Sequence, residues 1–561
     1  MHKNYRTVQS TVTFIKLYEK SFRENFDFPA LSNYGTKMNY TYGALAKEIA
    51  KFHILFKECK IKEGDKISLV GKNTTNWGIV HVATFTYGAV IVPILQDFNP
   101  MDISHIIDHS DSVLLFCADS IWDKLDKNQF PQLKAAFSLN DFRLLQQRPG
   151  ENLNNTMSHL DAQLNEIYPG GFTREHINYA NLPDDEIVVL NYTSGTTGFS
   201  KGVMITGRNL SGNITFADRI FHLKAGNRML SFLPLAHTYG IAFDFLYALS
   251  AGCHVTFLGK TPAPKILMTA LDDVKPDIII SVPLIFEKLY KNMIIPLLRK
   301  RHIKLALRIP LLDEQICGQF RDKLMKAMGG KFIQVIIGGA AFNSEAEDFL
   351  LKIKFPFSVG YGMTECAPLI SFSLCKDFVP HSCGKVLDCM QVRIDSEDPY
   401  HIAGEIQVKG QNVMLGYYKN EKATCAAFTD DGWLKTGDLG TIDENDNIFI
   451  RGRSKSMILG SNGQNIYPEE IESKLDNLPF IMESLVLEKK TKLIALVYPD
   501  KDAVDQAGIS QEVLLKIMEQ NKETLNKMVA SYEKIAEIQL HPTEFEKTPK
   551  KSIKRFLYTA K

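Results

Sequence analysis

The sequence lacks the patterns that mark several large classes of protein. It has nine cysteines in 561 residues, an odd number with no Cys-x-x-Cys pair, so it offers no zinc or iron–sulfur spacing. Its charge is nearly balanced, with 65 Lys and Arg against 64 Asp and Glu, which argues against a basic nucleic-acid footprint or an acidic tail. We therefore expect reduced thiols and no nucleic-acid partner.

Long apolar runs are also missing. The longest, at residues 89–95 and 277–286, fall well short of the ~20 residues that span a bilayer and predict buried strands of a parallel sheet. The N-terminal 25 residues contain no apolar stretch of the kind that forms a secretory signal core. We expect a cytoplasmic protein, and peripheral contact with the inner face of the membrane stays open as an alternative.

What the sequence does contain points to large, layered cores. Hydrophobic residues make up 45% of the chain. Short β-rich runs alternate with helical patterns through residue 340, which indicates βαβ units and a mostly parallel sheet. After residue 383 short alternating segments, the last of them Ser-Met-Ile-Leu-Gly, predict a small antiparallel β subdomain. The predicted fold class is α/β, with a large N-terminal domain (1–453) and a small α+β C-terminal domain (454–561).

A loop rich in glycine and hydroxyl side chains follows a predicted strand, in the sequence YTSGTTGFSKGV at 192–203. Glycines let the backbone approach an anion, hydroxyl and N–H groups can hold phosphate oxygens, and Lys201 adds a positive charge. The alternative is a strand-to-helix turn of small residues. It is not a Walker A loop, because Ser200 and Gly202 stand where Gly and Ser/Thr are required. The candidate phosphate ligands are Thr193, Ser194, Gly195, Thr196, Thr197 and Gly198.

This loop resembles the phosphate loop of the adenylate-forming superfamily, which contains acyl-CoA synthetases, luciferases and peptide-synthetase adenylation domains. The family pattern is TSGTTG-x-PKG, and this chain has Ser200 in place of the proline. That departure removes no phosphate ligand. Further motifs of the same family follow in family order across nearly the whole chain.

Two of these motifs imply a nucleotide site. They are IIGGAA at 336–341 and SVGYGMTECAP at 358–368. By resemblance, Thr364 contacts the α-phosphate and Glu365 is the Mg²⁺ ligand, a role that suits a hard carboxylate oxygen. The resemblance also assigns an aromatic ring that stacks near adenine and small residues around the base and phosphates: Tyr361, Gly362, Gly339 and Ala340.

Motifs nearer the C-terminus resemble the family's ribose site and domain junction. Asp438, in WLKTGDLG, would accept hydrogen bonds from both ribose hydroxyls. The resemblance implies that Arg453 contacts ribose or phosphate and that Lys455 is the hinge of a mobile C-terminal lid domain. Gly463 would belong to the loop that lines the thiol channel after this domain has turned.

The segment FLPLAHTYG at 232–240 resembles the family's acyl-pocket segment. It implies that His237, Tyr239 and Gly240 line the acyl pocket, with a buried structural histidine as the alternative for His237. SVPLIFEKLY at 281–290 is similar to a stretch of long-chain acyl-CoA synthetases. Together these segments favour a medium- to long-chain fatty acid as the substrate.

The family's last motif is where the match breaks. The family reads approximately TP-x-GK-I-x-R, whereas this chain reads TPKKSIKR at 548–555, so Ser552 stands at the catalytic lysine's position. Our leading hypothesis is that Lys551 substitutes for it. The alternatives are that Lys550 or Lys554 does so, or that adenylation is impaired.

The resemblance implies an AMP-forming acid–thiol ligase that uses ATP and Mg²⁺, with CoA as co-substrate. The carboxylate would attack ATP to give acyl-AMP, and a thiol would then form the thioester and release AMP. Catalysis would depend on positioning and charge stabilisation, with no nucleophilic side chain. Two alternatives remain: loading of an acyl-carrier protein, and, because of Ser552, a non-catalytic nucleotide- or acyl-binding homologue. The sequence indicates neither the acyl chain length nor the oligomeric state.

A basic stretch could touch a membrane surface. Residues 291–308 carry six Lys or Arg and no acidic residue, interleaved with Ile, Leu and Ala. This pattern is compatible with an amphipathic face that contacts anionic lipid, and with an ordinary solvated surface helix.

Overall fold

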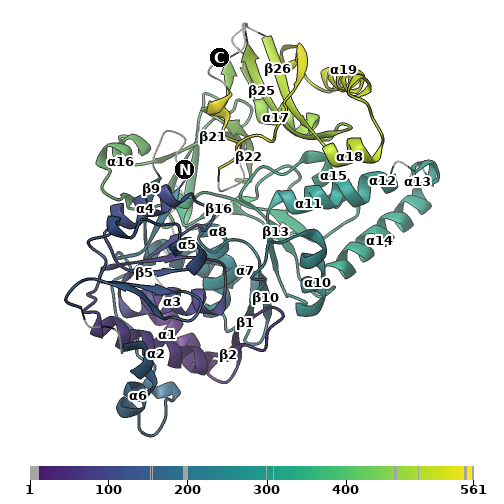
Figure 1. Ribbon diagram of the computed structural model, residues 1–561. Coiled ribbons are helices and arrows are strands. Elements are labelled where there is room, and N and C mark those ends of the chain that lie inside the picture. Colours follow the sequence, from purple (N-terminus) through teal and green to yellow (C-terminus); the bar gives the residue numbers. More distant parts are fainter. Residues whose placement is uncertain are drawn as a thin grey trace.

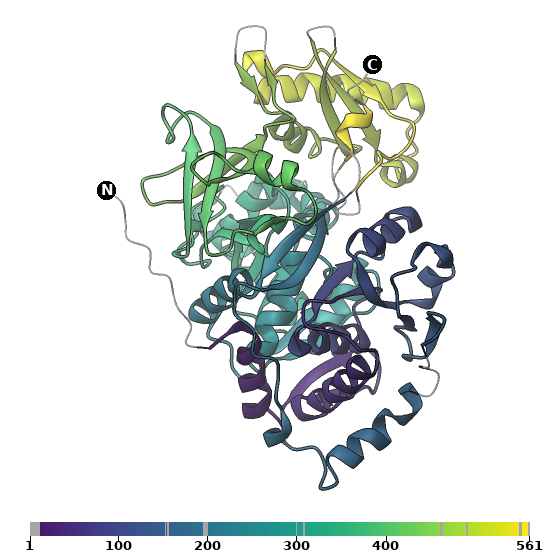
Figure 2. The ribbon, with the colours of Figure 1, turned by 90° about the vertical axis from the view of Figure 1, so that its left-hand side faces the viewer.

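The computed structural model shows a large N-terminal body with a smaller C-terminal domain against one end of it (Figures 1 and 2). The residues described are 12–151, 153, 156–193, 200–298, 300–306, 309–459, 464–489, 492–548 and 553–558. All nine cysteines are free. Within those residues, the helices are either too short or too polar to cross a membrane.

An eight-stranded sheet forms the centre of the body. Its middle strands are parallel, and antiparallel pairs occur only at the two ends of the sheet. In spatial order the strands are β20 (Gly416–Tyr417), β9 (Lys201–Thr206), β8 (Ile187–Thr193), β4 (Val90–Ile94), β3 (Lys66–Val70), β5 (Ser112–Cys117), β6 (Ala135–Ser138) and β7 (Leu144–Gln147). The predicted alternation of strands and helices is confirmed here.

Helices pack on this sheet because their sequences supply both caps and apolar faces. Thr41 and Thr74 accept hydrogen bonds from the first turns of α2 and α3, as N-cap residues do. Eleven residues of α3 are buried, so it is an interior helix. The helices of this region are α1 (Phe14–Glu24), α2 (Tyr42–Glu58), α3 (Thr75–Tyr87), α4 (Pro100–His109), α5 (Asp119–Trp122), α6 (Thr156–Ile167) and α7 (Gly207–Phe221).

Two smaller sheets, both mainly parallel, complete the core beside the cleft described below. One has the order β10-β11-β1-β2 and the other β12-β13-β14. Their strands are β10 (Arg228–Ser231), β11 (His254–Phe257), β1 (Pro29–Asn33), β2 (Asn39–Thr41), β12 (Ile279–Ser281), β13 (Val335–Ile337) and β14 (Phe357–Val359). Associated helices are α8 (Thr238–Gly240), η3 (Ile241–Tyr247), α9 (Ala248–Ser250), α10 (Pro264–Val274), α11 (Pro283–Leu289), α14 (Pro310–Ala327) and α15 (Ser344–Lys352).

The prediction of one buried strand over residues 277–286 is wrong in its second half. Only Ile279–Ser281 is a strand, and α11 begins at Pro283. Proline suits the first turn of a helix, because its ring presets φ and its missing N–H has no partner to lose there. The change from strand to helix therefore falls at this proline.

The predicted antiparallel subdomain is present as the sheet β18-β19-β21-β22, with β15-β16-β17 beside it. Two residues of Ser-Met-Ile-Leu-Gly, Ile458 and Leu459, form β23 (Ile458–Leu459), which lies outside that sheet and pairs with β24 (Asn465–Ile466). The other strands are β15 (Tyr361–Gly362), β16 (Leu369–Phe372), β17 (Lys385–Val386), β18 (Met390–Asp395), β19 (Gly404–Gly410), β21 (Leu434–Ile442) and β22 (Ile448–Arg453). The short turn η5 (Thr364–Cys366) joins β15 to β16, and α16 (Glu421–Ala427) follows β20.

The C-terminal domain is α+β, as predicted. Its sheet β25-β26-β27 packs against α17 and α19 around a separate apolar core. The elements are α17 (Pro468–Leu475), β25 (Ile481–Lys489), β26 (Lys492–Pro499), α18 (Lys501–Gln506), α19 (Gln511–Met528) and β27 (Glu537–Leu540). Asn343, at the start of α15, reaches this domain: its Nδ2 donates to Asn477 Oδ1 (3.0 Å) and to the Ser473 carbonyl (3.1 Å).

The basic stretch 291–308 is not one continuous helix. It runs through η4 (Tyr290–Ile294), α12 (Ile295–Leu298) and α13 (Arg301–Ala306), which extend with α14 as an arm at the right of Figure 1. Lys291 is half-buried, and its Nζ donates to the Ile481 carbonyl of the C-terminal domain. It therefore does not belong to an exposed basic face, whereas Lys300 and Arg301 are exposed.

Candidate active site

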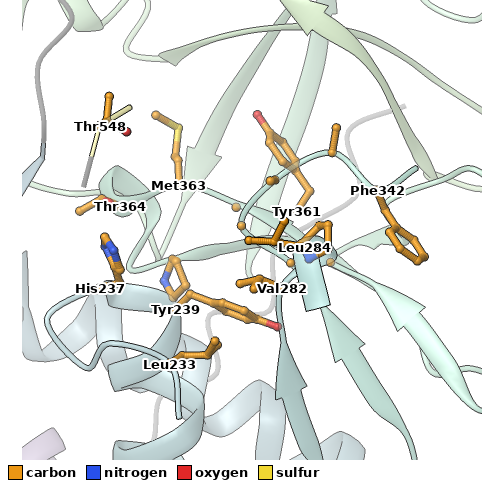
Figure 3. A pocket seen from close by; sticks show the side chains of 18 of the residues that line it. Leu233, His237, Tyr239, Val282, Leu284, Phe342, Tyr361, Met363, Thr364 and Thr548 are labelled. Atoms are coloured by element: carbon orange, nitrogen blue, oxygen red, sulfur yellow. The ribbon is translucent and has the colours of Figure 1, made fainter. Parts of the chain in front are cut away.

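A cleft of about 2790 Å³ is lined by both parts of the chain. The N-terminal body contributes residues from β9, η5, β13 and β21, and the C-terminal domain contributes Thr548 and Arg555 among others. Figure 3 shows the close-up, with His237, Thr364 and Thr548 gathered at one side and Tyr239 and Val282 deeper among the ribbons. All the predicted site residues that the structure describes line this one cleft.

The strands on either side of the predicted phosphate loop form a hairpin. Thr193, at the end of β8, pairs with Lys201, at the start of β9, and both line the cleft. The loop between them, with Ser194, Gly195, Thr196, Thr197 and Gly198, lies outside the described residues. Two of the predicted phosphate-binding positions, Thr193 and Lys201, are therefore held side by side by a β-ladder.

Glu365 and Lys201 meet the same aromatic side chain. Tyr417 donates its hydroxyl proton to Glu365 Oε1 at 2.8 Å, and Lys201 Nζ lies 4.7 Å from the centre of the Tyr417 ring. Burial raises the pKa of Tyr417, and the charge of Glu365 acts in the same direction, so the phenol keeps its proton. Thr364 is buried at the start of η5 and lines the cleft beside Glu365.

Tyr417 is a cleft residue that the sequence did not predict. A tyrosine in a two-residue strand carries no charge pattern, and its place at the cleft depends on the pairing of β20 with β9. The nearest signal was the Gly-Tyr-Tyr run at 416–418, which ends a β-rich stretch.

Asp438 lies at the centre of a second polar cluster. Tyr361 donates its hydroxyl proton to Asp438 Oδ2 at 2.7 Å, and Arg453 Nε lies 2.7 Å from Oδ1. Asp438 and Arg453 are direct neighbours across β21 and β22. Burial raises the pKa of Asp438 and Arg453 opposes that rise. Each carboxylate oxygen keeps a second lone pair, so the predicted acceptance of ribose hydroxyls remains chemically available.

The turn after β13 brings two predicted adenine contacts to the cleft. Gly339 and Ala340 are exposed and line it. Gly338, before them, leaves room for Tyr239: a Cβ there would lie 3.2 Å from that ring's Cζ. Gly362 also meets a steric need, because a Cβ there would lie 2.1 Å from the Pro368 carbonyl oxygen.

The predicted acyl-pocket residues line an apolar branch of the cleft. His237 is half-buried at the start of α8, and Gly240 lies at its end. Tyr239 presents only its ring, because its hydroxyl donates to the Ile336 carbonyl at 3.1 Å. The apolar side chains of this branch include Phe216, Phe221, Phe232, Phe243, Leu267 and Met268.

The C-terminal segment lines the cleft both before and after Lys551, the predicted catalytic lysine. Lys551 and Ser552 lie outside the described residues, as does Gly463. Lys547 and Ile553 form an isolated antiparallel bridge, so the two flanks are held together. Thr548 lines the cleft from this segment.

The predicted hinge residue also lies at the cleft. Lys455 follows the last strand of the antiparallel sheet, in a turn where Ser454 N–H donates to the Gly437 carbonyl at 2.9 Å. Lys455 lines the cleft. Its predicted role as a hinge remains a prediction.

Comparison with known proteins gives a consistent result. The AMP-binding enzyme family matches residues 18–418, and the AMP-binding enzyme C-terminal domain matches residues 455–561. The long-chain-fatty-acid–CoA ligase FadD15 of Mycobacterium bovis is 29% identical over 79% of this chain and 74% of its own length. The long-chain-fatty-acid–CoA ligase 6 of Mus musculus is 26% identical over 90% of this chain and 77% of its own.

A solved structure shares the fold. ATP-bound MatB from Rhodopseudomonas palustris superposes with a TM-score of 0.73 at 21% identity, covering 97% of this chain and 98% of that one. This likeness concerns the fold. With the family match over most of the chain, it confirms the resemblance inferred from the motifs: the chain belongs to the AMP-binding enzyme family, within the adenylate-forming superfamily.

Proposed function

We propose that the protein is an AMP-forming acid–CoA ligase whose acid is a medium- to long-chain fatty acid. In the first half-reaction, the fatty-acid carboxylate attacks the α-phosphorus of ATP, and pyrophosphate leaves. In the second, the CoA thiol attacks the acyl carbon of acyl-AMP, which gives acyl-CoA and AMP. Family membership supports the reaction class, and the two fatty-acid ligases named above support the choice of acid.

The observation that carries this proposal is the continuity of the cleft. Its lining includes Lys201, Glu365 and Asp438, which suit a nucleoside triphosphate, and apolar side chains such as Phe216 and Met268. A site of this kind can hold a charged nucleotide and an apolar chain together. The reacting carboxylate would then lie between them, near Thr364 and His237, which Figure 3 shows on the same side of the cavity.

The residues at the charged end fit Mg²⁺ bound together with a nucleotide. Glu365 Oε1 accepts the Tyr417 hydroxyl, while Oε2 accepts no hydrogen bond from any described residue. Within the described residues no group of three His, Cys, Asp or Glu side chains forms a metal cage. Mg²⁺ is usually held by one or two carboxylates and by substrate phosphates, which matches a single glutamate. When bound, Mg²⁺ would neutralise charge on the phosphates.

The chain's own residues would do the rest by positioning and charge. Lys201 and Thr364 would hold phosphate oxygens, and Asp438 with Arg453 would fix the ribose. Lys551 would approach the carboxylate and α-phosphate from the C-terminal domain. None of these groups needs to form a covalent intermediate, because acyl-AMP itself is the activated species.

For the second half-reaction we propose that the C-terminal domain turns about Lys455. This turn would withdraw residues 548–556 from the cleft and bring Gly463 to the thiol channel. The domain boundary we propose, after residue 453, lies at the end of β22. The short connection at Ser454 and Lys455 supports a hinge there.

Contact with anionic lipid is a further part of the proposal, because fatty acids are collected from membranes. The arm exposes Lys300 and Arg301 close in sequence to exposed Leu297 and Leu305. We expect the protein to float with anionic vesicles and to do so less after Lys300→Glu with Arg301→Glu. If the protein floated equally well with zwitterionic vesicles, or if the unchanged protein did not float at all, the arm would be an ordinary solvated surface.

The central experiment measures AMP and pyrophosphate release with MgATP and fatty acids of increasing length, with and without CoA. We expect CoA-dependent AMP formation with the longer acids. Pyrophosphate release with accumulating acyl-AMP and no CoA product would point to an acyl-carrier protein as acceptor. Nucleotide binding without turnover of any acid would favour the non-catalytic homologue that Ser552 suggests.

A further inference from the structure

Tyr417 stands between two side chains of opposite charge. Its hydroxyl donates to Glu365 Oε1 at 2.8 Å, and its ring lies under Lys201 Nζ at 4.7 Å from the ring centre. All three line the cleft. No ion pair joins Lys201 to Glu365 in the described part of the chain, although both face the same ring. Tyr417 therefore contacts both charged side chains, the carboxylate through its hydroxyl and the ammonium group through its ring.

The backbone around Tyr417 is held from several directions. Tyr417 pairs with Val203 of β9, the strand that begins at Lys201. Its N–H donates to Thr424 Oγ1 at 2.9 Å. The N–H of Met414 donates to the Glu365 carbonyl at 2.8 Å. The segment that carries the ring is therefore tied to the backbone of Glu365 and to the strand that carries Lys201.

The ring and the hydroxyl have separable effects. The ring face attracts the ammonium group and keeps it away from the carboxylate. The hydroxyl occupies Oε1 and so fixes the orientation in which Oε2 is presented. Carboxylates that bind metals are commonly oriented by such outer partners.

We propose that Tyr417 is a positioning residue that keeps Lys201 and Glu365 from neutralising each other and aims the free oxygen of Glu365 at the metal–nucleotide complex. The inference rests on the proposed use of Mg²⁺ and ATP. It assigns a role to a residue outside the motifs named above and separates that role into two parts.

The two parts predict different phenotypes. Tyr417→Phe keeps the ring and removes the hydroxyl, so Glu365 should lose its orientation while Lys201 stays in place. The affinity for nucleotide with Mg²⁺ should fall about tenfold, and the affinity without Mg²⁺ should stay unchanged. Tyr417→Leu removes the ring as well. Lys201 can then pair with Glu365, and both affinities should fall.

The test is calorimetric binding of a non-hydrolysable ATP analogue, once with Mg²⁺ and once with a chelator. Tyr418→Phe is a matched control, because it removes a similar hydrogen bond, from the Tyr418 hydroxyl to Asp111 Oδ2 at 2.8 Å, outside the pair. We expect the ratio of the two affinities to fall in Tyr417→Phe and to stay unchanged in Tyr418→Phe. Thermal unfolding of both variants identifies any general loss of structure.

A second variant tests whether Tyr417 acts through Glu365. In a Glu365→Gln background, Tyr417→Phe should change the affinity ratio no further. An unchanged ratio in Tyr417→Phe, or an equal loss in the presence and absence of Glu365, overturns the proposal while leaving the proposed function standing. If the unchanged protein binds neither form of the nucleotide, the proposed function fails, and this inference fails with it.

Discussion

The N-terminal body and the C-terminal domain contribute to the cleft in different ways. In the body, Glu365 is already held by Tyr417 through a side-chain hydrogen bond. In the C-terminal segment, Thr548 lines the cleft, but the nearby Arg555 pairs with Glu472 of α17 in its own domain. One half of the site is therefore assembled from residues of the N-terminal body alone. The other half depends on where a separate domain is placed.

This difference suggests a division of labour. Residues of the body should govern binding of the nucleotide, whatever position the C-terminal domain takes. Residues at 548–556 should govern only the half-reaction in which that domain faces the cleft. Substitutions in the two regions should therefore separate affinity from rate.

The largest effect is expected from Lys551→Ala. Loss of one positive group at the reacting phosphate should slow acyl-adenylate formation by about 10²–10³-fold. Thioester formation from supplied acyl-AMP should remain near its original rate. Pyrophosphate exchange and single-turnover thioester assays measure the two steps separately.

Two further variants sharpen this result. Ser552→Lys should restore adenylation to Lys551→Ala, because it puts a lysine at the family's position. Lys554→Ala should have a small effect, since Lys554 Nζ lies 3.6 Å from Glu546 Oε2. If Lys554→Ala severely slowed acyl-adenylate formation while Lys551→Ala left its rate unchanged, Lys554 would be the catalytic lysine instead.

A smaller effect is expected from Asp438→Asn. The variant keeps the shape of the side chain but weakens its bonds to Arg453 and to the ribose. The KM for ATP should rise about tenfold with little change in kcat. Steady-state kinetics with ATP and with 2′-deoxy-ATP tests this, because the variant should lose most of its preference for ATP. A change in kcat alone would contradict the division of labour.

A few-fold effect is expected from Asn343→Ala. Asn343 and Asn477 exchange hydrogen bonds across the two parts of the chain, at 3.0 and 3.2 Å. Loss of these neutral bonds should lower the equilibrium constant for contact between the C-terminal domain and the body by about three- to tenfold. Hydrogen exchange of α17 measures this shift. Asn477→Ala, which leaves the bond from Asn343 to the Ser473 carbonyl, should have a smaller effect, and the double variant should be no worse than Asn343→Ala.

The smallest effect concerns pH. Burial raises the pKa of Glu287 in α11 to about 7 and that of Asp476, beyond α17, to about 7. Facing them are Lys291, the Asn343 N–H, Ser484 and Glu483.

In both carboxyl groups the pKa in the folded protein lies above the ordinary value. At a pH between the ordinary pKa and the raised one, the folded protein therefore binds more protons than the protein with these groups exposed. The contact between the domains should therefore be strongest at low pH, weaken as pH rises from about 4 to about 7, and change little above that. Hydrogen exchange of α17 as a function of pH measures this trend. Glu287→Gln with Asp476→Asn should flatten it, and an unaltered slope in that variant would assign the trend to other groups.

Local sequence predicted the fold class well, and the misses have local causes. Strand 90–94 is apolar throughout and strand 112–117 is apolar after Ser112, as strands buried on both faces are. The run 277–286 is equally apolar, and only Pro283 marks its change to a helix. Ser-Met-Ile-Leu-Gly has strand character, but the strand with which its Ile458 and Leu459 pair lies six to eight residues ahead, which composition alone does not reveal.

The site was predictable where a motif carries it. Asp438 and Thr364 each belong to a motif that could be recognised in the sequence, and both line the cleft. Tyr417 was not predictable in this way, because its position depends on β20 joining β9 from more than 200 residues away. The hydroxyl of Tyr239 illustrates the same limit: its backbone partner is in β13.

The contact between Asn343 and the C-terminal domain has a consequence for how the protein responds to ionic strength. Amide groups of Asn343 and Asn477 carry no net charge, and Lys291 meets a carbonyl oxygen of that domain. Mobile ions screen attraction between charges over about 10 Å at 0.1 M but scarcely affect short bonds between neutral dipoles. The amide bonds should therefore hold as salt rises, whereas the partly exposed pair of Arg451 with Glu470, which joins β22 to α17 at 3.6 Å, should weaken.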